Sequence, residues 1–81
     1  MTTNLPSDAT DYELVVRFTS YVLTTDQVGR CDHLRSAGLE LARLITGSTP
    51  ASREQLLALT HLEEAIMQAN AAIARRELWL S

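Results

Sequence analysis

Residues 52–76, SREQLLALTHLEEAIMQANAAIARR, decide the fold of this 81-residue chain. Ser52 and Gln55 have the spacing of a capping box, which marks the start of a helix, and Pro50 suits a first helical position. Apolar residues then recur at alternating steps of three and four, as in a coiled-coil seam: Leu59, Leu62, Ile66, Ala69 and Ile73. This pattern predicts a helix over residues 51–77, which at 1.5 Å per residue is about 38 Å long.

A preceding helix is predicted over residues 25–46, with Thr24 or Thr25 as its cap. Its apolar positions are Val28, Cys31, Leu34, Leu41 and Ile45. Gly38 lies among them, although glycine costs a helix interior about 1 kcal/mol relative to alanine. We interpret Gly38 as a point where another helix approaches closely.

The N-terminal part has a different pattern. Residues 1–11 are polar and aperiodic, which predicts a flexible arm. Residues 12–23, YELVVRFTSYVL, are rich in β-branched and aromatic residues and predict an extended segment, with a short helix as the alternative. At the other end, Trp79 and its apolar neighbours indicate a tail that docks onto another surface.

These elements predict an all-α fold, an antiparallel two-helix hairpin preceded by a short extended segment, in one domain over residues 12–81. Its core would be one side chain deep. Each helix keeps a second apolar edge: Leu39, Leu44, Leu56, Leu57 and Met67. Exposed apolar surface costs about 25 cal/mol per Å², so the hairpins are expected to assemble into a homo-oligomeric helical bundle.

Composition limits which kinds of partner and which cellular compartment are expected for this protein. The net charge is −3, whereas a protein that binds duplex nucleic acid normally carries a basic patch. No apolar run approaches the roughly 20 residues that a membrane span needs. The first residues lack the basic start and apolar core of a signal peptide, and Cys31 has no partner for a disulfide, so we expect a cytoplasmic protein.

Two arginines are candidate ligand residues. Arg53 lies in the first turn of the second helix, where free N–H groups and a guanidinium could together bind a phosphate. The alternative is a solvated arginine paired with Glu54 or Glu40. Arg35 projects from the middle of the first helix beside the seam, where it either reaches a pocket or forms a surface ion pair.

Three further residues are candidates for base or amide contacts. Phe18 and Tyr21 precede the first helix, where they could stack on a nucleobase or instead close one end of the hairpin core. Asn70 lies among alanines, and it either forms a hydrogen bond across a subunit interface or binds ligand.

No metal, cofactor or catalytic site is expected. Cys31 and His33 are two residues apart on a helix and so face different ways, and His61 stands alone. The sequence contains no nucleophile–base arrangement and no phosphate-cradling glycine loop. These observations argue against an enzyme.

The stretch SREQLLALTHLEEAIMQANAAIAR closely resembles the helical hairpin shared by phage anti-CBASS and anti-Thoeris nucleotide sponges. In that family a Phe-Thr segment, here Phe18-Thr19, precedes two helices, and the second opens Ser-Arg-Glu, as at residues 52–54. The resemblance covers residues 18–76. It implies a homo-oligomer, commonly a hexamer, that traps cyclic oligonucleotide or cyclic ADP-ribose messengers in the cytoplasm of the infected bacterium without degrading them.

The resemblance also implies roles for particular residues. Arg35 matches the family's basic residue midway along the first helix, and Arg53 matches the Ser-Arg-Glu arginine. The base-stacking aromatic position falls on Ser20, so Phe18 or Tyr21 would take its place. Asn70 falls where some members carry a basic residue of a second pocket.

Two functions therefore remain open from the sequence. The first is the sponge. The alternative is a small helical interaction module, such as an antitoxin or an assembly adaptor, whose apolar seam binds a protein.

Overall fold

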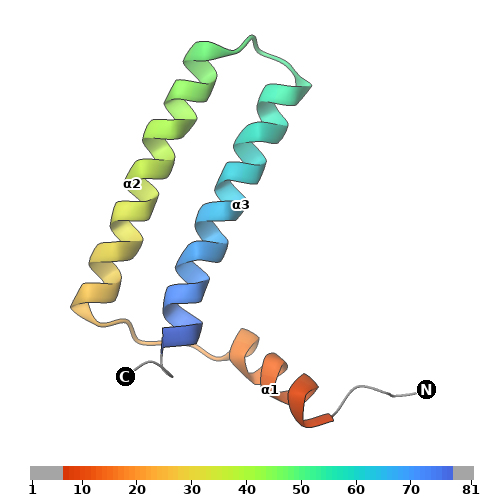
Figure 1. Ribbon diagram of the computed structural model, residues 1–81, viewed down its shortest axis with the longest axis vertical. Coiled ribbons are helices and arrows are strands. Elements are labelled where there is room, and N and C mark those ends of the chain that lie inside the picture. Colours follow the sequence, from red (N-terminus) through yellow and green to blue (C-terminus); the bar gives the residue numbers. More distant parts are fainter. Residues whose placement is uncertain (1–6, 78–81) are drawn as a thin grey trace.

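The computed structural model describes residues 7–77, which form three helices and no strand. Helix α1 spans Ser7–Phe18, α2 spans Thr25–Ser48 and α3 spans Arg53–Arg76. Helices α2 and α3 lie side by side and antiparallel, and α1 projects from the end of the hairpin where α2 begins and α3 ends (Figure 1). The predicted all-α hairpin is confirmed, and both long helices lie within two residues of their predicted limits.

Hydrogen-bonding side chains set where the two long helices begin. Thr24 caps α2 in a complete capping box with Gln27, whose side chain accepts from the Thr24 N–H at 2.9 Å. Ser52 caps α3 by accepting from the Gln55 N–H at 3.1 Å, but the Gln55 side chain returns to Thr49 instead. Because Ser52 is the cap, the prediction of Pro50 as a first helical residue was wrong.

The extended segment predicted over residues 12–23 was wrong for residues 12–18, which are helical. Glu13 and Arg17 form an ion pair of 3.5 Å at helical i,i+4 spacing. The positive charge of Arg17 in the last turn also interacts favourably with the helix dipole. These local interactions favour a helix, and the strand preference of the β-branched residues is weak outside a sheet.

Two predictions concern the ends of the chain: the flexible arm over residues 1–11 and the docking tail at Trp79. Residues 7–11 belong to the first turns of α1. The flexibility of residues 1–11 stays a prediction, because residues 1–6 lie outside the described part. Trp79 also lies outside the described residues.

Contacts between elements are concentrated between α2 and α3, and Gly38 marks their close approach. A Cβ atom at Gly38 would lie 2.9 Å from Cγ1 of Ile66, so only glycine leaves room for this side chain. The prediction that Val28 and Leu41 belong to the apolar face of α2 that packs on α3 was wrong, because their side chains are 44% and 45% exposed. The neighbouring Ala42 is better covered than Leu41, four residues after Gly38.

The hairpin and α1 form a single layer of helices. The principal extents are 47 × 39 × 17 Å, so the thickness leaves no room for a second layer. All five apolar side chains expected to stay uncovered in one chain are exposed: Leu39, Leu44, Leu56, Leu57 and Met67. Assembly into an oligomer remains a prediction. None of the helices described has the length and apolar character needed to cross a membrane.

Candidate ligand-binding groove

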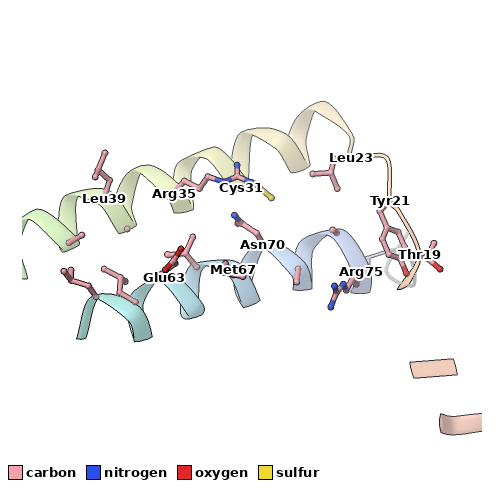
Figure 2. Close-up of a pocket in the computed structure, with 17 residues that line it drawn as sticks. Thr19, Tyr21, Leu23, Cys31, Arg35, Leu39, Glu63, Met67, Asn70 and Arg75 are labelled. Carbon is pink, nitrogen blue, oxygen red and sulfur yellow. The ribbon is translucent and has the colours of Figure 1, made fainter. Parts of the chain in front are cut away.

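A groove of about 930 Å³ runs along one face of the hairpin between α2 and α3. This volume lies within the range of small-molecule sites, about 300–1,000 Å³. The seam residues Leu59, Leu62 and Ile66 line it together with the small Gly38 and Ala42. The short linker between α1 and α2 closes one end, where Thr19 and Tyr21 lie (Figure 2).

Polar groups from three segments line this apolar groove. Tyr21 comes from the linker, Arg35 from α2, and Glu63, Asn70 and Arg75 from α3. Three of the five predicted site residues, Tyr21, Arg35 and Asn70, therefore line one groove. Two arginines against one carboxylate make the charge of the lining positive, although the whole chain carries −3.

Asn70 carries an unpaired polar atom. Its side chain points from α3 toward α2, where Arg35 and Cys31 lie (Figure 2). Its Oδ1 is buried and has no hydrogen-bond partner among the described residues. A buried acceptor without a donor costs about 1–3 kcal/mol, so a donor from water or from a ligand would stabilise this oxygen.

Arg35 is both a groove residue and a member of a surface ion pair. Its Nη1 donates to Asp32 Oδ1 at 3.0 Å, and both side chains are more than half exposed. Such pairs contribute about 0–1 kcal/mol, so an anion in the groove could replace Asp32 at small cost.

Phe18 and Arg53 do not reach the groove. Phe18 ends α1 and is 84% exposed. Arg53 is the first residue of α3, roughly 33 Å from Arg75 at the rise of an α-helix. It forms no ion pair within the described part of the chain, neither with Glu54 nor with Glu40. Within one chain, Arg53 and Tyr21 cannot contact the same small ligand.

The family model for the Acb2/Tad1 hairpin domain matches residues 11–74. The chain belongs to this family. Its members are the anti-CBASS and anti-Thoeris sponges, as the sequence resemblance predicted. Comparisons with curated proteins and with solved structures gave no match.

The part of this Acb2/Tad1 hairpin that the family model covers contains nearly the whole groove. Arg75 alone among the lining residues lies beyond residue 74. Sequence reasoning missed Arg75, Glu63 and Thr19. A signal for Glu63 was present, because Glu63, Met67, Asn70 and Ala74 repeat the steps of the seam one residue later.

The open end of the hairpin, where α2 begins and α3 ends, is held by a charged clamp. Arg30 donates two hydrogen bonds of 2.6 Å to Glu77, and Gln27 adds one of 3.1 Å to the same carboxylate. The hydrogen bonds from Arg30 and then Gln27 lower the pKa of Glu77 to about 2. The clamp fixes the spacing of the helices next to the groove.

Helix α1 is attached to the same end of the hairpin. Arg76 donates to both carboxylate oxygens of Glu13 at 3.0 and 3.1 Å, and these hydrogen bonds hold the pKa of Glu13 below its ordinary value. Val16 is only 2% exposed and is the buried apolar residue of this attachment.

The histidines and the cysteine form no metal centre in the described residues. Cys31 is buried beside the groove, whereas His33 and His61 are exposed. No group of three metal-ligating side chains occurs within residues 7–77.

Proposed function

We propose that this protein is a phage anti-defence sponge that sequesters cyclic oligonucleotide or cyclic ADP-ribose type messengers without degrading them. The observation that carries the proposal is the groove, whose apolar floor is lined by an aromatic ring, two guanidinium groups and an amide oxygen without a partner in the described residues. It lies in a protein of the sponge family.

Each part of the groove matches one property of such a messenger. Arg35 and Arg75 offer guanidinium groups to the phosphates, and Tyr21 offers a ring face to a base. The Oδ1 atom of Asn70 would accept from an N–H or O–H of the ligand. Tight stoichiometric binding, with no turnover, would be enough to silence a signal.

The open groove and the distant Arg53 also support a role for several copies. We propose a homo-oligomer, a hexamer as is common in the resembled sponges, in the cytoplasm of the infected bacterium. In such an assembly Arg53 would meet ligand as part of a neighbouring copy's pocket, and Phe18 would act from its exposed position at the end of α1.

Titration calorimetry with a panel of cyclic di-AMP, cyclic di-GMP, cyclic GMP–AMP, cyclic tri-AMP and cyclic ADP-ribose tests the proposal. We expect binding of at least one compound, which chromatography should recover intact. Arg35→Ala should weaken binding about tenfold or more, since it removes a charge-assisted hydrogen bond worth about 1.5–3 kcal/mol.

The matched control is Arg43→Ala, which removes the same charge from the same helix. Arg43 is exposed, lies outside the groove and forms no ion pair in the described residues. Equal losses in the two variants would assign the effect to net charge and remove Arg35 from the site.

The alternative function, a helical interaction module, is favoured by the exposed apolar edges, where Leu44 and Leu56 are 62% and 64% exposed. The two functions differ in a thermal-shift assay. A sponge gains about 2.7 kcal/mol of stability at a ligand concentration of 100 times Kd, whereas an adaptor is unaffected by the panel.

A further inference from the structure

Three side chains that line the groove also hold the last turn of α1. They donate to three successive carbonyl oxygens: Thr19 to Val15, Tyr21 to Val16 at 3.3 Å, and Arg75 to Arg17 at 3.5 Å. Two of the groups best suited to bind a messenger are therefore already engaged by the protein itself. A ligand that takes the guanidinium of Arg75, or that turns the ring of Tyr21 to stack on a base, must replace these contacts.

The contacts from Tyr21 and Arg75 are weak ones. The 3.3 Å of the Tyr21 O–H contact lies beyond the usual range of about 2.5–3.0 Å, and the 3.5 Å of the Arg75 N–H contact lies beyond the usual range of about 2.7–3.2 Å. The carbonyl oxygens at a helix C-terminus carry only a partial negative charge, whereas a phosphate carries a full one. The guanidinium of Arg75 makes one contact of 3.5 Å to the carbonyl of Arg17, whereas it can form two parallel hydrogen bonds to a phosphate of full negative charge, so a phosphate would displace that carbonyl.

The rest of the α1 attachment lies outside the groove. Glu13 and Arg76 form their bidentate pair, and neither residue lines the groove. This separation makes it possible to loosen α1 without changing a ligand contact.

We propose that ligand binding in the groove and docking of α1 compete for Tyr21 and Arg75, so that an anionic ligand releases the last turn of α1. This inference rests on the proposed function, because it needs a ligand in the groove. Coupling between two binding events is reciprocal, so a loosened α1 must also strengthen ligand binding.

The test compares Glu13→Gln with Asp11→Asn, using calorimetry and the same panel of cyclic nucleotides. Both substitutions remove one negative charge from α1. Only Glu13 is paired, since Asp11 is exposed and makes no hydrogen bond or ion pair in the described residues. We expect the Kd of Glu13→Gln to be about fivefold or more below that of Asp11→Asn, at the lower end of typical coupling.

Arg76→Gln separates this coupling from long-range charge effects. This substitution also breaks the Glu13–Arg76 pair, but it changes the residue on α3 and removes a positive charge. Loss of a positive charge by itself weakens anion binding. Tighter binding by Arg76→Gln would support the competition, and weaker binding by both Arg76→Gln and Glu13→Gln would overturn it.

Hydrogen–deuterium exchange of the wild-type protein gives an independent measurement. We expect the amides of residues 7–18 to exchange faster when ligand is bound, while those of residues 34–48 do not. Binding with unchanged or slower exchange in residues 7–18 would overturn the coupling and leave the sponge function standing. Failure of the wild type to bind any compound would overturn both.

Discussion

At the residue scale, two of the three glycines within α2, Gly38 and Gly29, form a natural comparison. A Cβ at Gly38 would lie 2.9 and 3.1 Å from two atoms of Ile66, whereas nothing lies within 4 Å of one at Gly29. Overpacking costs about 1–3 kcal/mol, which exceeds the gain of about 1 kcal/mol in helix propensity. Gly38 is therefore fixed by packing, and Gly29 is not.

We expect Gly38→Ala to lower the free energy of unfolding by about 1 kcal/mol and Gly29→Ala to raise it by up to about 1 kcal/mol. Urea titration followed by circular dichroism measures both. Stabilisation by both substitutions would show that Ile66 moves aside without cost and that the close approach does not restrict residue 38.

At the scale of the elements, the clamp between α2 and α3 makes stability depend on pH. The pKa of Glu77 is lowered to about 2 from an ordinary 4.5, so its contribution is complete above pH 4.5 and is lost as the pH falls toward 2. The lowered pKa of Glu13 acts in the same direction at the α1 attachment. Acid should therefore loosen the end of the molecule where all three helices meet.

Glu77→Gln should remove the clamp's share of this acid sensitivity, which thermal unfolding between pH 2 and 6 measures. The control is Glu54→Gln, because Glu54 is exposed and forms no ion pair within residues 7–77. If the melting temperatures of the wild type and Glu77→Gln decline in parallel below pH 4.5, the clamp does not contribute.

The long helices were predictable because their signals are local. The caps at Thr24 and Ser52 each act within three residues, and the seam of α3 follows a fixed period. A short helix was only the alternative for residues 12–23, because composition favoured a strand, and the Glu13–Arg17 pair is one local interaction that favours the helix. The clamp joins residues 47 apart in the sequence, and no local pattern fixes that register.

The candidate site was only partly predictable for the same reason. Each residue type was identified from its chemistry, but which residues meet depends on how three segments align. Tyr21, Arg35 and Asn70 line one groove because the linker returns to its end, whereas Arg53 lies at the opposite end of α3. The roles of all five residues stay predictions.

At the scale of the whole molecule, the single layer of helices should be completed by other copies. Leu44→Glu places a charge on an exposed apolar edge, and we expect sedimentation velocity to show smaller particles with unchanged helix content. The control Ser36→Glu adds the same charge at an exposed polar position of the same helix. Parent-sized particles for Leu44→Glu would exclude this edge from the interface.

Ile66→Asp is a poor test of assembly, although Ile66 belongs to the predicted seam. Its side chain contacts Gly38 within the same hairpin. A charge there should unfold the protomer itself, so a change in particle size would not report on contacts between copies.

The contact between Gly38 and Ile66 also has an evolutionary consequence. Two positions that share one fixed volume should change together in descendants of a common ancestor. Related chains with alanine or serine at the position of Gly38 should carry valine or alanine at the position of Ile66. A lineage that enlarged both would have had to move its two long helices apart and so reshape the floor on which any messenger rests.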